Sequence, residues 1–257
     1  MKREIHKWNS SSLQKEMEIA VYGFYGYALL MFPNDESDYM EYERSHVIEA
    51  ISPYIEQGHI KVYSVNGEGL FNNSSDPSEK TQRHGQYNQY VTNEVIPFIY
   101  ESCNGEVPVV TAGISVGAYH AANSFFRRPD LFKGLIAMSG TYDIRFFMRD
   151  YFDDHCYFNS PVDFLPNLAD EILLEEMRSG KIIISSGQGE NENPSQSMQL
   201  SEILNSKNIP HLFDLWGKDM SHDWPTWRQM LPYFLNKVDP SELVSEPKEE
   251  LQDMSQQ

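Results

Sequence analysis

The feature that most constrains this chain is the pentapeptide Gly113-Ile-Ser-Val-Gly117, because of what lies on either side of it. The preceding residues 107–112 form a short β-branched run typical of a buried strand, and the residues from Ala118 onward favour a helix. A G-x-S-x-G pattern between strand and helix puts Ser115 on a sharp turn, with its hydroxyl exposed at the helix N-terminus. The alternative interpretation of this pattern is an ordinary glycine turn without a chemical role. The flanking segments favour a nucleophilic serine.

Strand-like and helix-like segments alternate along the rest of the chain. Strands are predicted at 16–22, 28–32, 60–65, 107–113, 135–138, 181–185 and 211–216. Helices are predicted over residues 38–57 and 118–128. One more begins at Asp76, another ends at Lys207, and the last ends at Lys237. This order predicts an α/β fold, a mainly parallel sheet with helices on both faces. In detail, residues 23–26 predict a hairpin between the first two strands, and Asp38 with Glu41 resembles a capping box.

The length of 257 residues allows one large domain, which we expect to span residues 1–238. The aromatic and acidic segment 140–180 interrupts the alternation and predicts a lid or pocket wall, with a peripheral helical hairpin as the alternative. Residues 239–257 carry six acidic residues and one basic residue, so a disordered acidic tail is predicted there.

Charge and composition limit the kinds of partner that this chain can bind. A net charge of −18 disfavours nucleic acids and anionic membranes, which require basic patches. There is no apolar run long enough to span a membrane, and no apolar segment follows the basic N-terminus as in a secretory signal. The two cysteines, Cys103 and Cys156, fit a reducing compartment. We therefore expect a cytoplasmic protein that acts on a small molecule; the sequence leaves its oligomeric state open.

An acyl-transfer serine needs a base, an acid that orients the base, and donors for the oxyanion. Of eight histidines, His222 is the one in the loop between the last predicted strand and the last helix. His84 and His155 border the same region but are expected to play ordinary polar roles, and His120 is expected to pack on the elbow helix. The sequence gives no indication of a function for His6, His46, His59 or His211.

The sequence offers two candidates for the acid, Glu190 and Glu192, both in the loop that follows strand 181–185. Asp219 and Asp223 lie on the histidine's own loop and are expected to shape it.

One oxyanion N–H is expected from Val116, the residue after the nucleophile. The other is expected from Asn34, after strand 28–32, although that loop also fits a plain connection.

No cofactor or metal is expected. The sequence lacks the phosphate-binding, dinucleotide-binding and H-E-x-x-H patterns. The run Asp153-Asp-His-Cys156 has ligand-type residues, but four adjacent side chains cannot all converge on one tetrahedral ion.

The chain resembles the putative-esterase branch of the α/β hydrolases, which includes S-formylglutathione hydrolases, enterochelin-esterase-like enzymes and mycolyltransferases. The likeness covers roughly residues 15–237. It rests on four motifs, Gly113-Ile-Ser-Val-Gly-Ala-Tyr-His-Ala121, Ser139-Gly-Thr-Tyr-Asp143, Gly187-Gln-Gly189 and Ser221-His-Asp-Trp-Pro-Thr-Trp-Arg228.

The resemblance implies an α/β-hydrolase fold and a serine hydrolase that cleaves a carboxylic ester or thioester through an acyl-enzyme. It implies Ser115 as nucleophile, His222 as base and Glu192 as acid. The chain departs from the pattern at Asn191, where the pattern has tryptophan. Two other functions share these residues, a non-catalytic binding protein of the same fold and an acyltransferase.

Overall fold

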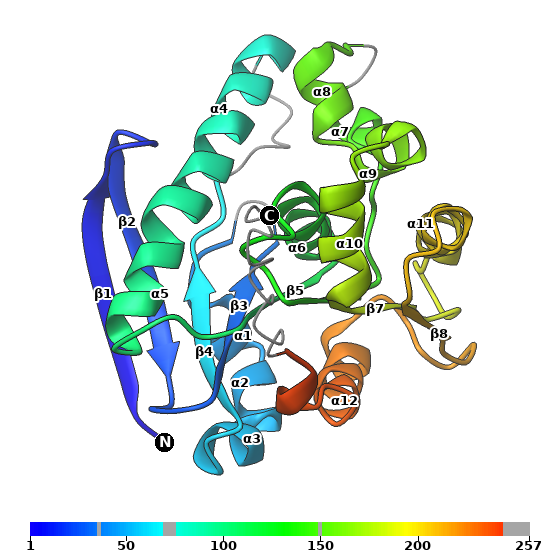
Figure 1. The fold of residues 1–257 in the computed structure, drawn as a ribbon. Helices are drawn as coiled ribbons and strands as arrows, with labels where there is room; N and C mark the ends of the chain where they lie inside the picture. Colours follow the sequence, from blue (N-terminus) through cyan, green and yellow to red (C-terminus); the bar gives the residue numbers. More distant parts are fainter. Residues whose placement is uncertain (35–36, 69–75, 149–150, 244–257) are drawn as a thin grey trace, which may run out of the picture.

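The computed structural model describes residues 1–34, 37–68, 76–148 and 151–243, and its centre is an eight-stranded sheet (Figure 1). The strands are β1 (Arg3–Ser10), β2 (Lys15–Tyr22), β3 (Tyr27–Phe32), β4 (Ile60–Val65), β5 (Val109–Ile114), β6 (Gly134–Met138), β7 (Lys181–Ser186) and β8 (Leu212–Leu215). Their order across the sheet is β1-β2-β4-β3-β5-β6-β7-β8. All pairs from β4 to β8 are parallel, and β2 is antiparallel to both of its neighbours. The predicted mainly parallel sheet is confirmed.

The helices cover both faces of the sheet. They are α1 (Glu41–Arg44), α2 (Val47–Ala50), α3 (Ser52–Glu56), α4 (Pro77–Tyr90), α5 (Ile96–Ser102), α6 (Val116–Arg127), α7 (Arg145–Met148), α8 (Asp154–Phe158), α9 (Pro161–Phe164), α10 (Glu171–Ser179), α11 (Pro194–Ser206) and α12 (Trp224–Leu235). A π-helical turn, η1 (Val91–Val95), joins α4 to α5, and the 3-10 turns are η2 (Leu165–Asn167) and η3 (Pro240–Leu243). Within the described ranges, no helix has both the length and the apolar character needed to cross a membrane.

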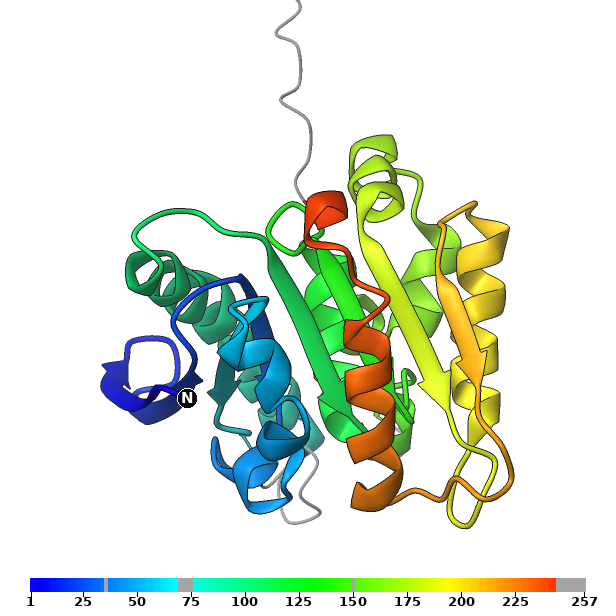
Figure 2. The ribbon, with the colours of Figure 1, turned by 90° about the horizontal axis from the view of Figure 1, so that it is seen from below.

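Alternate residues of each central strand pack into two separate hydrophobic cores, one on each face of the sheet. In β3, Leu30 and Phe32 face the core under α4, α6, α10 and α11, whereas Leu29 and Met31 face the core under α1–α3 and α12. Figure 2 shows α12 lying across this second face. Because both faces are covered, β3 to β6 are buried along their whole length, which explains their mainly apolar sequences.

The predicted hairpin at the N-terminal end is wrong, and one strand there was not predicted. The hairpin at residues 23–26 does not form, because β4 lies between β2 and β3. The link instead crosses the start of β4, where a Cβ on Gly26 would lie 2.4 Å from the His59 backbone. The unpredicted strand is β1, an edge strand whose residues alternate between exposed and partly buried, so its sequence lacks an apolar run.

The predicted helix 38–57 is three short helices rather than one. The chain turns at His46, whose φ of +62° is left-handed, and restarts before Pro53. The capping box is also wrong, because Met40 rather than Asp38 is the N-cap of α1 and Glu41 bonds elsewhere. By contrast, Asp76 caps α4 by accepting from the Ser78 N–H, as its sequence predicts.

Residues 140–180 and 239–257, the two segments expected to lie outside the main alternation, differ in how they fold. The described part of 140–180 folds as α7 to α10, and α9 and α10 contribute to the first core through Phe164, Leu174 and Met177. The predicted tail does not begin at residue 239, because Leu243 of η3 is buried and Glu242 pairs with Lys181 at 2.7 Å. Residues 244–257 lie outside the described part of the chain.

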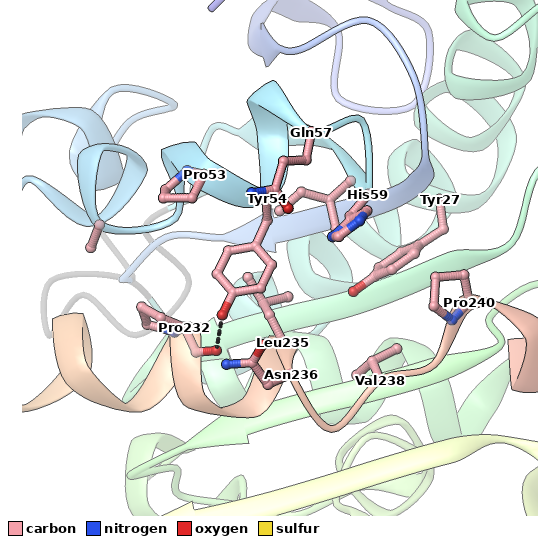
Figure 3. Close-up of a pocket in the computed structure, with 12 residues that line it drawn as sticks. Tyr27, Pro53, Tyr54, Gln57, His59, Pro232, Leu235, Asn236, Val238 and Pro240 are labelled. Carbon is pink, nitrogen blue, oxygen red and sulfur yellow. Dashed lines mark hydrogen bonds between the residues drawn. The ribbon is translucent and has the colours of Figure 1, made fainter.

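A cavity of about 540 Å³ lies at the sheet end where the parallel strands begin (Figure 3). Tyr27 and Ile60, the first residues of β3 and β4, line it together with Tyr54 and the end of α12. Ser115 follows the last residue of β5, so it belongs to the other end of the sheet.

Candidate active site

The turn between β5 and α6 holds Ser115 in a strained backbone conformation. Its φ is +56° and its ψ is −119°, in a region that non-glycine residues rarely occupy. A Cβ on Gly113 would lie 2.0 Å from the Gly117 carbonyl oxygen, and one on Gly117 would lie 2.2 Å from that of Phe32. Both glycines are therefore required by close backbone approach. The turn presents the serine hydroxyl at the start of a twelve-residue helix.

The N–H of Val116 is the first of α6. The first N–H groups of a helix have no partner within it and carry its partial positive charge. The geometry thus leaves a backbone donor beside the Ser115 hydroxyl, where an anionic oxygen would be stabilised.

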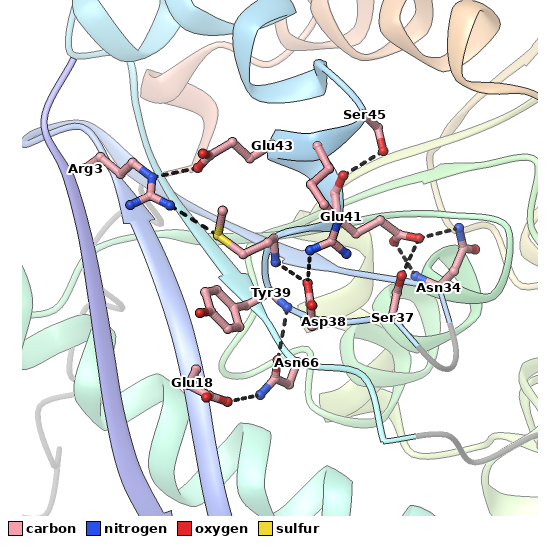
Figure 4. A network of polar contacts seen from close by, with 12 residues as sticks. Arg3, Glu18, Asn34, Ser37, Asp38, Tyr39, Glu41, Glu43, Ser45 and Asn66 are labelled. Atoms are coloured by element: carbon pink, nitrogen blue, oxygen red, sulfur yellow. Dashed lines mark hydrogen bonds and ion pairs between the residues drawn. The ribbon is translucent and has the colours of Figure 1, made fainter.

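The N–H of Asn34, the other predicted oxyanion donor, is already engaged in this structure. It donates to the Glu41 carboxylate at 2.7 Å, and the Asn34 side-chain amide donates to the same group at 3.2 Å (Figure 4). The Ser37 hydroxyl donates to it as well, at 2.8 Å. The N–H of Asn34, which we predict to bind an oxyanion, is thus bonded to Glu41, which turns back onto the β3–α1 loop instead of capping its own helix.

The loops after β7 and β8 are joined through their backbones. A Cβ on Gly187 or Gly189 would lie 2.2 Å or 2.7 Å from the Met220 carbonyl oxygen, so only glycine permits the contact. The Gly189 N–H donates to that oxygen at 2.8 Å, and the His222 N–H donates to the Glu190 carbonyl at 2.9 Å. The glycines of the Gly-Gln-Gly motif therefore fix the histidine loop against the acid loop.

His222 lies between the serine and a carboxylate. Its Nε2 is 3.0 Å from Ser115 Oγ, a hydrogen-bond distance. Its Nδ1 is 3.5 Å from Oε2 of Glu192, which is longer than an ordinary hydrogen bond but within ion-pair range. Such contacts are often long before substrate binds. The structure thus brings Ser115, His222 and Glu192 together in the order that a serine hydrolase requires.

Glu192 has a closely bonded carboxylate, its side chain being only 1% exposed. The hydroxyls of Ser139 and Ser186 donate to its two oxygens at 2.6 Å and 3.0 Å. Burial acts to raise the pKa of Glu192, but His222 and these hydroxyls outweigh it, so the pKa lies below its usual value. Neither serine was predicted as a partner of Glu192: Ser139 follows the neighbouring strand β6, and Ser186 is the last residue of β7, six positions before Glu192.

The competing acids lie elsewhere. The Glu190 side chain is exposed, and only its backbone carbonyl reaches His222. Asp223 caps α12 by accepting from the Thr226 N–H at 3.0 Å, and Asp219 is exposed beside Gly217. Asp223 therefore fixes the junction between its loop and α12.

The other histidines of interest lie between α4, α6 and α8, where His84 and His120 are buried and His155 is partly buried. His120 stacks on Phe32 and His84, as its predicted packing role requires, and burial lowers its pKa to about 3. Burial likewise lowers the pKa of His84, whose Nε2 lies 3.1 Å from the Tyr119 hydroxyl. His155 packs against Gly85 and His84. These contacts are those of ordinary polar packing.

The run from Asp153 to Cys156 does not gather ligands. Asp153 is the N-cap of α8 and accepts from the Cys156 N–H at 2.8 Å. Across the part of the chain that the structure describes, no three His, Cys, Asp or Glu side chains are arranged to hold a metal ion.

The family model described as "Putative esterase" matches residues 36–238, which include all of Ser115, Glu192 and His222. The chain belongs to this esterase family. It is a carboxylic ester hydrolase of the α/β-hydrolase fold. No curated protein sequence matches this esterase.

Solved structures share the fold of this esterase at low sequence identity. A ferulic acid esterase superposes with a TM-score of 0.71 at 19% identity, covering 92% of this chain and 99% of its own. The fluorophosphonate-binding serine hydrolase F of Staphylococcus aureus gives 0.65 at 16% identity, covering 95% and 99%. An S-formylglutathione hydrolase from Agrobacterium tumefaciens gives 0.65 at 14% identity, covering 92% and 95%. At these identities the likeness establishes the fold of this esterase.

Proposed function

We propose that this esterase cleaves a small carboxylic ester or thioester with Ser115 as nucleophile, His222 as general base and Glu192 as the acid that orients His222. The observation that carries the proposal is the 3.0 Å contact between His222 Nε2 and Ser115 Oγ at the strained turn. A serine hydroxyl is a weak nucleophile until an adjacent base takes its proton, and this contact supplies the base.

In the proposed reaction, Ser115 Oγ attacks the acyl carbon while Nε2 of His222 takes the hydroxyl proton. The negative charge that develops on the substrate oxygen is stabilised by the Val116 N–H at the start of α6. The proton then passes from His222 to the leaving alcohol or thiol, which leaves an acyl-enzyme on Ser115. Water attacks the acyl-enzyme with His222 as base again and frees the acid product.

Asn34 enters this scheme only through a change at Glu41. Its N–H becomes a second oxyanion donor when the Glu41 carboxylate turns away from it, since one hydrogen cannot serve both acceptors fully. Exchange of the carboxylate for substrate is therefore part of the proposed binding step at this loop.

Glu192 is proposed to stay ionised throughout. Its lowered pKa keeps it negatively charged near neutral pH, where it stabilises the imidazolium that forms at His222. Among the neighbouring acids, Glu192 is the one whose carboxylate faces Nδ1.

We further propose that the enzyme works in the cytoplasm, which fits its two free cysteines, Cys103 and Cys156. Its charge of −18 supports a small-molecule substrate rather than a nucleic acid.

The test is labelling with a fluorophosphonate probe and turnover of p-nitrophenyl esters and thioesters of graded chain length. The wild type should label and turn over at least one substrate, whereas Ser115→Ala should do neither. A folded wild-type protein that resists the probe would instead favour a non-catalytic binding protein. Products analysed with an added alcohol or thiol acceptor separate hydrolysis from acyl transfer, which uses the same residues.

A further inference from the structure

Ser139 follows β6 as Ser115 follows the neighbouring strand β5, and its backbone is also left-handed. Its φ is +52°, it is 7% exposed, and its N–H donates to the Ser185 carbonyl at 2.8 Å. A glycine would adopt this conformation without the steric cost that a side chain brings. A buried serine in a strained position calls for a role for its hydroxyl.

The hydroxyl of Ser139 links α12 to the acid. It accepts the indole N–H of Trp227 at 3.0 Å and donates to Oε1 of Glu192 at 2.6 Å. An indole N–H can only donate, so it occupies a lone pair on Ser139 Oγ and leaves the single hydroxyl proton for the carboxylate. The direction of both bonds is thereby fixed, and each polarises the other.

Trp227 also contacts the base. Its ring meets the His222 imidazole edge to face, with centroids 4.9 Å apart and planes at 85°. Trp227 is 4% exposed and lies in the first turn of α12, directly after the histidine loop. One side chain therefore touches the base directly and reaches the acid through a single hydroxyl.

We infer that Ser139 and Trp227 are positioning residues of the catalytic machinery, which orient the Glu192 carboxylate toward His222. Ser139 holds Oε1, so that Oε2, which also accepts from the Ser186 hydroxyl, faces Nδ1 of His222 at 3.5 Å. The inference rests on the proposed function, because it assigns these residues to the same acid and base.

The first experiment separates the hydroxyl from the backbone. We expect kcat to fall about tenfold in both Ser139→Ala and Ser139→Gly, with KM within about twofold, because a misaligned acid impairs the chemical step. Ser139→Gly should melt no lower than Ser139→Ala, since glycine relieves the positive φ. A Ser139→Gly variant with wild-type kcat would overturn the inference, because the hydroxyl would then be dispensable.

The second experiment asks whether Ser139 acts through Glu192. In a Glu192→Gln background, Ser139→Ala should cause little further loss of kcat, because the carboxylate it orients is gone. A purely structural serine would cost the same factor in both backgrounds, and that result would contradict the inference.

The third experiment tests the indole N–H with a matched control. Trp227→Phe keeps an aromatic ring against His222 but removes the donor, so we expect a severalfold loss of kcat that does not add to that of Ser139→Ala. Trp224→Phe changes the neighbouring indole, which packs on Trp227 at 5.1 Å, and should keep wild-type kcat. Equal effects at both tryptophans would reject a specific role for the Trp227 N–H.

The outcomes distinguish this inference from the proposed function. Full activity in Ser115→Ala would reject the proposed function itself. Inactive Ser115→Ala and impaired Glu192→Gln, together with wild-type kcat in every Ser139 and Trp227 variant, would reject only the positioning roles.

Discussion

The two ends of the sheet differ in what they gather. Where the parallel strands begin there is a cavity of about 540 Å³, with one hydrogen bond from the Tyr54 hydroxyl to the Pro232 carbonyl drawn among its lining residues (Figure 3). Where the strands end, Ser115, His222 and Glu192 converge within hydrogen-bond or ion-pair range. In open α/β sheets, function is built at the carboxyl ends of the strands. The contrast teaches that converging polar groups, more than empty volume, mark the reactive end of this fold.

The reason lies in the backbone of each end. Beyond β5 the chain enters α6 directly, so a helix N-terminus with unpaired N–H groups faces Ser115. The cavity end is lined instead by the C-terminal residues of α12, Leu235 and Asn236, together with residues of the short helices α2 and α3. A negative charge is stabilised at the N-terminus of α6, beside Ser115.

The largest expected effect is at Ser115. Ser115→Ala should lower kcat by about a thousandfold or more with the fold intact, because deletion of a triad member leaves only oxyanion stabilisation and binding. His222→Ala should match it, and the double variant should be no worse than either. Steady-state kinetics with a p-nitrophenyl ester measure this. More than about a tenth of wild-type kcat in Ser115→Ala would break the comparison between the two ends.

The next effect separates the two acids of one loop. Glu192→Gln should lower kcat by at least about a hundredfold, because His222 loses the charge that orients it, whereas Glu190→Gln should change kcat only severalfold. Glu190 is the matched control, since it sits two residues away and contributes its backbone carbonyl to the same loop pair. The reverse result would move the acid to Glu190, and two mild effects would direct attention to Asp219.

A third prediction concerns stability against pH. The folded-state pKa of Glu192 is depressed below its ordinary value of 4.5, so its ionised form stabilises the fold above that pH. This contribution should be lost as pH falls through the lowered pKa. Urea unfolding of wild type and Glu192→Gln between pH 7 and about 3 should show a stability difference that changes only below about pH 4.5. A constant difference over the whole range would contradict the depressed pKa.

The smallest effect is expected at the cavity end. Tyr54→Phe removes the hydrogen bond to Pro232 and should cost about 0.5 to 1.5 kcal/mol of stability, with kcat and KM unchanged. Thermal unfolding and steady-state kinetics on the same sample check both parts. A marked fall in kcat without loss of stability would show that the two ends are coupled.

Sequence patterns predicted the sheet because its central strands are buried on both faces and therefore mainly apolar, as in β3 and β5. The same patterns failed where structure depends on distant contacts. Gly23 and Gly26 look like hairpin glycines, yet they serve a crossing over β4 that the local sequence does not encode. Glu41 fits a capping box until the Asn34 amide competes for its carboxylate.

The candidate site follows the same rule. Ser115 and His222 could be predicted because a local motif and the chain order mark them, and Glu192 because a family motif includes it. Ser139 and Trp227 could not be assigned contacts from the sequence, since their partners lie 53 and 88 positions away. The parallel alignment of β6 and β7 brings Ser139 near the loop of Glu192, and the packing of α12 on the sheet brings Trp227 to Ser139.

The backbone hydrogen bonds of the sheet continue for one residue beyond the ends of β5, β6 and β8. The N–H groups of Ser115, Ser139 and Trp216 donate to the carbonyls of Met138, Ser185 and Ser186 at 3.0, 2.8 and 2.9 Å. The reactive edge is therefore a continuation of the sheet rather than a set of free loops. An insertion of one residue within β5 or β6 would displace its serine by a whole strand step, which no change of rotamer could recover.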